Sequence, residues 1–191
     1  DIAILETGLG GRLDSVTACH AAGLIITSIS NDHNKILGPS IKEIAQEKAG
    51  AILPTTNFIL SANQDQKIKS ILNKSAEKIN TNIQYVRKNF LKKNKFIYLH
   101  GEHQEHNGSL TYEAAKKISN YFKFKINNKQ LIKHITTSYW PGRMQVIQKQ
   151  PTIIFDVCHN EAGLYACIKY FQTRKTLYNK KYIIAAFEEN K

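Results

Sequence analysis

The sequence predicts an α/β fold built on a parallel β-sheet. Short apolar runs with the composition of buried strands recur along the chain, and a segment with helical spacing separates the second run from the third. Strands that alternate with helices at this spacing are typical of parallel sheets. In the first 60 residues the expected strands are Ile2–Leu5, Leu24–Ile29 and Phe58–Leu60.

The segment between the second and third strands predicts a helix over Ile41–Ala49. Ser40 precedes this segment as an N-cap, and Glu43 lies three residues later, which is the spacing of a capping box. Gly50 follows the last apolar position and provides a C-terminal stop. The local chemistry therefore defines both ends of this helix.

The rest of the chain predicts a second set of elements, separated by a break at Trp140-Pro141-Gly142. This break places a boundary between a domain over 1–140 and one over 141–191. Before it we expect a lysine-rich amphipathic helix over 64–80, exposed strands over 83–99, and helices over 109–122 and 128–135. After it we expect a strand over Thr152–Phe155, a helix over 160–171 and a strand over 182–187.

Composition excludes several classes of protein. With 42% hydrophobic residues the 191-residue chain can bury a core, and it holds no run of about 18 apolar residues, so we expect neither disorder nor a membrane span. The three cysteines are widely spaced and include no CxxC pair. This pattern predicts buried, reduced thiols and argues against a disulfide framework or a zinc site.

The net charge of +12 raises the question of a nucleic-acid partner. Only four of the 27 cationic residues are arginine, the residue that reads phosphates and base edges best. The first 60 residues hold four cations and six anions, so the positive charge lies outside the segment richest in motifs. We therefore expect no specific nucleic-acid partner.

Polar residues follow the predicted strands. Glu6 ends the first strand, and His33 follows the second, so both would lie at the carboxyl edge of the sheet, where ligands gather. They offer one oxygen and one nitrogen to a divalent metal, although either residue taken alone is more often a surface or hydrogen-bonding group than a ligand. The loop Gly8-Leu9-Gly10-Gly11 lacks the third glycine of a dinucleotide fingerprint, and the chain contains no Walker A motif.

Three further segments have a structural and a functional interpretation. Lys48 ends the predicted helix, where a cation stabilises the helix dipole in any protein. Asp156-Val157-Cys158-His159-Asn160 ends one strand and opens a helix, with Asn160 as a plausible N-cap. His103-Gln104-x-x-Asn107 precedes a helix and is equally compatible with a polar loop.

In their order, these segments resemble the folylpolyglutamate synthase/dihydrofolate synthase family of the Mur-ligase superfamily. The resemblance implies the later part of a parallel-sheet ATPase domain, over 1–140, followed by the start of a Rossmann-like C-terminal domain, over 141–191. Because predicted buried strands lie at both ends, we expect an internal piece of a longer protein whose P-loop precedes residue 1. The matching segments are Glu6–Asp14, Thr27–His33, Leu37–Pro39, Glu47–Gly50, Gly101–Asn107, Pro141–Arg143 and Asp156–Asn160.

The resemblance implies a metal site in the first of these domains. Glu6 and His33 match the magnesium-binding Glu and His of the family. Lys48 matches a lysine that is carbamylated in family members and helps to hold a second metal. Carbamylation converts a cation into an anionic oxygen ligand, which suits a hard divalent ion.

The resemblance also implies an ATP site. Asn107 matches the adenine-contacting Asn, and Arg143 matches an Arg that reaches the phosphates from the hinge between domains. Asp156 and His159 match residues of the C-terminal domain that close over ATP. With Lys48, Arg143 and His159 form the expected catalytic set.

The implied activity is ATP-dependent ligation of L-glutamate to a folate or dihydropteroate carboxylate through an acyl phosphate. ATP and Mg²⁺ would be required, and the isolated fragment would be inactive.

The chain departs from the family pattern at two places. After the Gly-Gly-Arg-Leu-Asp segment, Val16 and Thr17 stand where the family usually has a Thr-Asn pair, and after His159-Asn160, Glu161 stands where it usually has Pro. We expect a cytoplasmic monomer without membrane contact, and a mitochondrial form stays open. The alternatives are another Mur-type amino-acid ligase and a non-catalytic basic fragment that binds nucleic acid or protein.

Overall fold

The computed structural model of the chain describes residues 2–86, 91, 94–173 and 180–186. The chain forms two units, one over 1–87 and the other over 88–191. The boundary predicted at 140/141 falls within the second unit, between a helix and a strand, and it stays a prediction.

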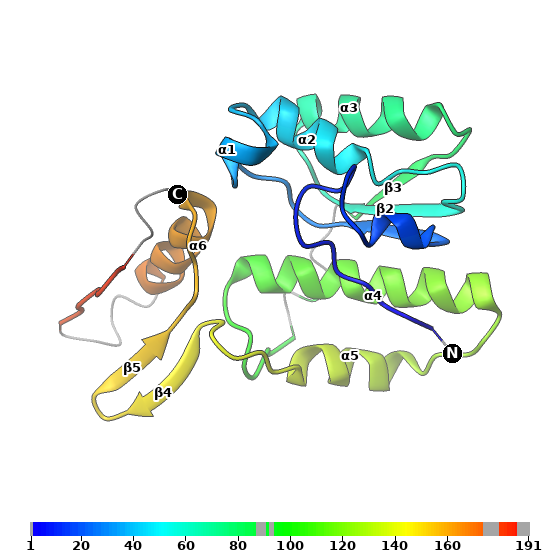
Figure 1. Cartoon of the computed structure of the whole chain (residues 1–191). Coiled ribbons are helices and arrows are strands. Elements are labelled where there is room, and N and C mark those ends of the chain that lie inside the picture. The colour runs from blue at the N-terminus through cyan, green and yellow to red at the C-terminus, as the bar shows by residue number, and fades with distance from the viewer. Residues whose placement is uncertain (1, 87–90, 92–93, 174–179, 187–191) are drawn as a thin grey trace. The chain divides into compact units, whose positions relative to one another are not determined.

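The first unit is built on a three-stranded parallel sheet, as the sequence predicts (Figure 1). The strand order is β1-β2-β3, so β2 is the central strand. All five residues of β2 are buried, and four of them are apolar, as expected for a central strand covered on both faces. The strands are β1 (Gly23–Ile26), β2 (Phe58–Ala62) and β3 (Ile83–Val86).

The capping box that the sequence predicts for α2 is confirmed. The Ser40 Oγ accepts a hydrogen bond from the Glu43 N–H over 3.3 Å, and the Glu43 Oε2 accepts one from the Ser40 N–H over 3.0 Å. Gly50 is the C-cap and its N–H donates to the Gln46 carbonyl over 3.0 Å. The helical segments of this unit are the 3₁₀ turn Thr17–Cys19, α1 (Asn34–Leu37), α2 (Ile41–Ala49) and α3 (Gln66–Glu77).

The core of the first unit lies between the sheet and the two longer helices. Figure 1 shows α2 and α3 on the same side of the sheet. Ile44 of α2, Ile59 of β2 and Leu72 of α3 are almost fully buried and belong to one apolar cluster. Their burial removes a large apolar area from water and holds the helices in place.

The second unit combines a helix pair with a hairpin and a final helix. Leu91, Phe96 and Ile135 form a small buried cluster against which residues of α4 and α5 pack. The strands β4 and β5 are antiparallel, with an irregularity between Val146 and Gln148. The elements are α4 (Glu102–Phe122), α5 (Asn128–Thr137), β4 (Gln145–Lys149), β5 (Thr152–Phe155) and α6 (Glu161–Gln172).

Several predicted elements are wrong. Residues 2–5, 94–99 and 182–186 form no strand, while residues 87–90, 92–93 and 187 lie outside the described part of the chain. The first of these segments is exposed, with Ile4 at 87%. Apolar composition alone does not make a strand, because a strand also needs a neighbour to complete its backbone hydrogen bonds. In addition, α4 begins at Glu102 instead of 109, and β4 had not been predicted.

No helix within the described residues is both long enough and apolar enough to cross a lipid bilayer.

Candidate functional site

Asp14 organises the glycine-rich loop of the first unit. Its Oδ2 accepts hydrogen bonds from the backbone N–H groups of Gly8 and Leu9, both over 3.0 Å, and its Oδ1 accepts one from Val16 over 2.9 Å. The bonds from Leu9 and Val16 lower the pKa of the Asp14 carboxyl below its ordinary value. Asp14 is therefore an anion at neutral pH and holds the loop in one conformation.

The same loop is fastened to the C-terminal end of α2. The Arg12 N–H donates to the Glu47 carbonyl over 2.9 Å, and the Arg12 Nη2 lies 2.9 Å from the Glu47 Oε1. A Cβ atom at Gly50 would lie only 2.4 Å from the Arg12 Cβ, so this approach requires glycine. The two motifs that contain Arg12 and Glu47 thus form one packed structure, and Lys48 lies next to it.

The predicted metal ligands occupy three places in the first unit. Glu6 is exposed ahead of the loop, and Lys48 is half-buried in the last turn of α2. His33 has a left-handed backbone (φ 51°), its N–H donates to the Asp32 Oδ1 over 2.9 Å, and its Nε2 lies 3.9 Å from that oxygen. A carboxylate and an imidazole are suitable donors for a divalent ion. The assignment of these three residues as metal ligands stays a prediction.

His103 lies in the first turn of α4 in the second unit. Its Nδ1 is buried and has no hydrogen-bond partner within the described part of the chain. Burial lowers the pKa of the imidazole, and the charges of Arg143 and His106 lower it further, against an opposing effect of Asp156. An unsatisfied buried polar atom costs roughly 1–3 kcal/mol, so a partner supplied by a ligand would relieve it.

Asn107 lies one turn further along α4. Its side chain is exposed, and its Nδ2 lies 3.5 Å from the Gln104 Oε1, the limit of a hydrogen bond. Its backbone carbonyl accepts a hydrogen bond from the Thr111 hydroxyl over 2.9 Å. The helix therefore fixes the backbone of Asn107 and leaves the amide at the surface.

Two loops that the sequence marks as separate motifs are joined in the second unit. The Val157 N–H donates to the Gly142 carbonyl over 2.9 Å, and the Met144 N–H donates to the Asp156 Oδ2 over 2.8 Å. Gly142 has a φ of 71°, and a Cβ there would lie 2.7 Å from the Val157 Cγ1. These contacts place exposed Arg143 beside the turn that carries Asp156.

His159 follows that turn and is exposed. Its Nδ1 lies 3.2 Å from the Val157 carbonyl oxygen. Asn160 caps α6, because its Oδ1 accepts a hydrogen bond from the Gly163 N–H over 2.8 Å. The structural interpretation of Asn160 is thus confirmed, and the role of His159 stays a prediction.

The predicted site residues therefore form two groups, each within one unit. The structure brings the loops of Arg143 and Asp156 together, and their charges act on His103. Sequence reasoning missed Asp14 as the organiser of its loop. A usable signal existed, since an Asp after a glycine-rich turn readily accepts hydrogen bonds from nearby backbone N–H groups.

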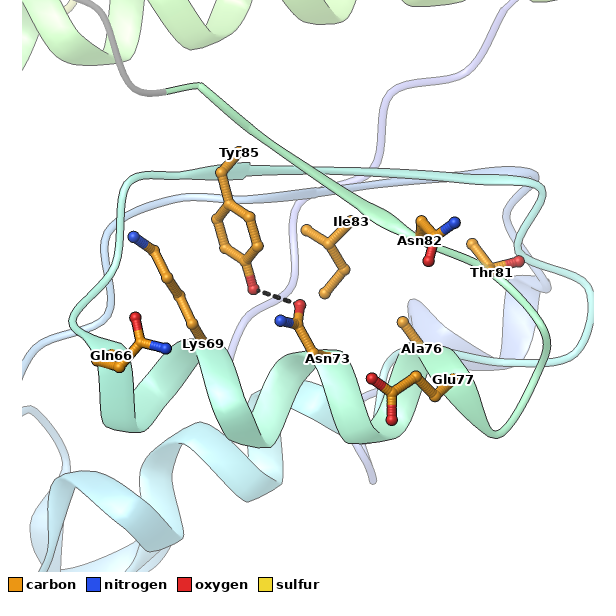
Figure 2. Close-up of a pocket in the computed structure, with 9 residues that line it drawn as sticks. All are labelled: Gln66, Lys69, Asn73, Ala76, Glu77, Thr81, Asn82, Ile83 and Tyr85. Carbon is orange, nitrogen blue, oxygen red and sulfur yellow. Dashed lines mark hydrogen bonds between the residues drawn. The ribbon is translucent and has the colours of Figure 1, made fainter.

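A polar hollow of about 430 Å³ lies elsewhere in the first unit, between α3 and β3 (Figure 2). The Tyr85 hydroxyl donates to the Asn73 Oδ1 over 2.9 Å, and the Lys69 Nζ lies 5.4 Å from the centre of the Tyr85 ring. The predicted site residues do not line this hollow. The hollow is therefore separate from the motif residues.

Comparison with known proteins gives consistent relatives. The dihydrofolate synthase/folylpolyglutamate synthase of Bacillus subtilis is 29% identical over 184 residues, covering 86% of this chain and 43% of the relative. The protein of the same name from Buchnera aphidicola (Acyrthosiphon pisum) is 35% identical over 173 residues, covering 84% and 40%. No protein-family model matches the chain.

Solved structures show the same likeness. Mycobacterium tuberculosis folylpolyglutamate synthase, complexed with ADP and AMPPCP, superposes with a TM-score of 0.75 and 26% identity. The match covers 90% of this chain and 44% of that one. The α/β fold with a parallel sheet is thereby confirmed. The chain spans about two fifths of the length of the curated relatives that it matches.

Proposed function

We propose that this chain, which belongs to the folylpolyglutamate synthase/dihydrofolate synthase family, forms part of an ATP-dependent ligase that adds L-glutamate to a folate or dihydropteroate. The substrate carboxylate attacks the γ-phosphorus of ATP, which gives an acyl phosphate and ADP. The amine of glutamate then attacks the acyl carbon, an amide bond forms, and phosphate leaves with the bonding electron pair.

Support for nucleotide binding comes from one juxtaposition in the second unit. The loops of Arg143 and Asp156 are joined by the hydrogen bond from the Met144 N–H to the Asp156 Oδ2. The charges of Arg143 and Asp156 act on His103, whose buried Nδ1 has no partner within the described residues. A cation beside an unsatisfied buried donor or acceptor is a suitable environment for a polar, anionic ligand.

The side chains of the second unit would bind and orient ATP. The planar guanidinium of Arg143 can form two parallel hydrogen bonds with phosphate oxygens, and it is exposed. Asn107 presents both a donor and an acceptor, as recognition of the adenine edge requires. Asp156 and His159 would help to exclude water as the site closes.

Glu6 and His33 would hold Mg²⁺ in the first unit, and Lys48, once carbamylated, would help to hold a second metal ion. The Glu6 carboxylate and a carbamate on Lys48 supply anionic oxygens and His33 supplies a nitrogen, and donors of these kinds suit such ions. When bound, the ion neutralises charge on the phosphate oxygens. The Gly50–Arg12 contact keeps the end of α2, and with it Lys48, in place.

In our proposal, ATP-dependent glutamate ligation requires a longer polypeptide than these 191 residues. The chain covers 43% and 40% of two curated relatives, and it contains no Walker A motif. We propose that the isolated chain does not turn over ATP and that the complete polypeptide acts as a cytoplasmic monomer.

The proposal is tested with the complete polypeptide encoded by the gene. Glu6→Gln and Lys48→Ala should each lower ATP-dependent glutamate addition by about 100-fold or more, as expected when a group that stabilises the transferring phosphoryl is lost. Lys42→Ala is the matched control, because Lys42 is an exposed cation on the same helix. Near-normal turnover in both site variants would refute the assignment.

Two further measurements address the alternatives. The complete polypeptide is assayed with a panel of amino acids, each offered together with a folate, a dihydropteroate or a carboxylic acid that lacks the pteroate group. Joining of glutamate to a folate or dihydropteroate indicates a folate ligase, whereas joining of an amino acid to one of the other acids indicates another Mur-type ligase. Binding of generic DNA or RNA to the chain should be negligible at physiological salt. Tight binding that weakens steeply as salt rises would favour a basic nucleic-acid-binding fragment instead.

A further inference from the structure

Three sulfur atoms and a carboxylate come together in the second unit. The Cys158 Sγ and Cys167 Sγ lie 3.8 Å apart, and the Cys167 Sγ lies 3.6 Å from the Met144 Sδ. A carboxylate oxygen of Asp156 and the two thiol sulfurs all lie within 4.8 Å of one another. We refer to Met144, Asp156, Cys158 and Cys167 as the sulfur cluster.

The separation of the two thiols matches that of ligands around one metal ion. An ion with tetrahedral geometry and metal–sulfur bonds of about 2.3 Å holds its sulfur ligands about 3.8 Å apart. The observed distance between the Cys158 Sγ and the Cys167 Sγ is 3.8 Å. A disulfide requires a separation of about 2.05 Å, so the sulfurs are not bonded to each other, and at this distance the Cys167 thiol donates a hydrogen bond to the Cys158 Sγ.

The backbone around the sulfur cluster holds these donors in position. Asp156 accepts hydrogen bonds from the Met144 N–H and the Cys158 N–H, both over 2.8 Å. Each of its oxygens keeps a further lone pair for a cation. A Cβ at Gly163 would lie 2.9 Å from the Cys158 Cβ, so the glycine allows α6, which carries Cys167, to approach closely.

The surroundings of the two thiols oppose free thiolates. Burial, together with the Asp156 carboxylate and Cys158, raises the pKa of Cys167 to about 12. Burial also raises the pKa of Cys158. Both thiols are therefore protonated and weakly reactive at neutral pH. The Asp156 carboxylate also contributes to both shifts, and its negative charge attracts a metal ion, which can displace the thiol protons.

We propose that Cys158 and Cys167, with the Met144 sulfur and the Asp156 carboxylate as further donors, bind one thiophilic metal ion of the d¹⁰ class, such as Zn²⁺ or Cu⁺. Binding releases two protons, one from each thiol, as two metal–thiolate bonds form. Thiolate and thioether ligands select metals of this class. The sequence analysis predicts buried thiols, which is wrong for Cys19, because that residue is exposed, while Cys158 and Cys167 are half-buried. Our proposal departs from the sequence-based expectation that the chain has no zinc site.

The site is tested by titrating the full chain, metal-free and kept reduced by a phosphine, with Cd²⁺. Ultraviolet thiolate-to-cadmium absorbance should saturate at one equivalent. Cys158→Ser and Cys167→Ser should each weaken binding at least tenfold, and the double variant should lose the absorbance. Cys19→Ser is the matched control and should bind as the parent chain does, because Cys19 is exposed and lies in the first unit.

Zn²⁺ and Cu⁺ are then compared in competition with chelators. Met144→Leu should weaken Cu⁺ binding more than Zn²⁺ binding, because thioethers prefer Cu⁺. A second readout does not depend on variants: one equivalent of Zn²⁺ should protect two of the three thiols of the parent chain from alkylation. Absence of protection, or cadmium absorbance that survives in the folded double variant or disappears in Cys19→Ser, would overturn the proposal.

Discussion

The backbone N–H of Arg12 donates to the carbonyl of Glu47 over 2.9 Å, and their side chains pair at 2.9 Å. This pair of residues joins the glycine-rich loop to the end of α2. The side chains are 56% and 27% exposed, so the ion pair contributes only about 0.2–1 kcal/mol. The close approach of the two backbones, which a glycine permits, matters more for the position of Lys48.

Gly50→Ala should therefore destabilise the chain by about 1–3 kcal/mol, the usual cost of forcing atoms into a packed contact. The new Cβ would lie 2.4 Å from the Arg12 Cβ, while the backbone of Gly50 (φ −65°) already suits alanine. Urea unfolding measures the change. Gly8→Ala is the control, because its Cβ would meet nothing closer than 3.5 Å. Equal losses in both variants would show that the approach is not tight.

Asp14→Asn should destabilise the loop at neutral pH, because the variant replaces a charged acceptor of three backbone hydrogen bonds. Hydrogen bonding lowers the pKa of Asp14 from 3.8 in the folded state. The contribution of the carboxylate is thus complete above 3.8 and is lost as the pH falls through the folded pKa. Unfolding curves of the two proteins should converge in acid. A difference that persists unchanged there would contradict this role.

Ser40→Ala should reduce the free energy of unfolding by about 0.5–2 kcal/mol, because it removes the N-cap of the helix that carries Lys48. The variant removes the Ser40 Oγ, which accepts the hydrogen bond from the Glu43 N–H, and keeps the backbone N–H that donates to the Glu43 Oε2. Ser70→Ala, on the exposed face of α3, is the control and should be neutral or slightly stabilising, since alanine favours a helix interior. Urea unfolding of the two variants compares them directly. A loss in both of similar size would point to a general effect of removing serine.

Local signals were sufficient for some elements and not for others. The capping box at Ser40 and the strand Thr152–Phe155 were predicted correctly, because the capping box joins residues three positions apart and the strand pairs with the segment just before it, Gln145–Lys149. Residues 2–5 form no strand although their composition suits one, because strand formation depends on a neighbouring strand. The start of α4 at Glu102 was also missed, since residues 102–107 are polar and carry no apolar period.

The candidate site shows the same division. The motifs of Arg143 and Asp156 could be identified in the sequence, but the hydrogen bond that joins their loops depends on tertiary packing. The pairing of Cys158 with Cys167 likewise depends on how closely α6 packs, which Gly163 allows. The spacing of the two cysteines in the sequence contains no signal for it.

His103 should make the stability of the chain depend on pH below about 6.5. Burial is the main cause of the lowered pKa of its imidazole in the folded state, whereas the unfolded chain binds the proton near the ordinary value of 6.5. The unfolded state thus holds more protons as the pH falls from 6.5 towards the folded pKa, so stability falls in that range. Above 6.5 the imidazole is neutral in both states and the effect vanishes.

Urea unfolding at about pH 7.5, 6.5 and 5.5 tests this dependence in the parent chain and in His103→Phe, which cannot titrate. The parent should lose more stability on acidification than the variant. His134→Gln is the control, because His134 is exposed on α5, and it should follow the parent. If His103→Phe and the parent lose stability equally on acidification, the buried imidazole is not the source of the pH dependence. In that case the unsatisfied Nδ1 of His103 would no longer support a ligand site beside Arg143.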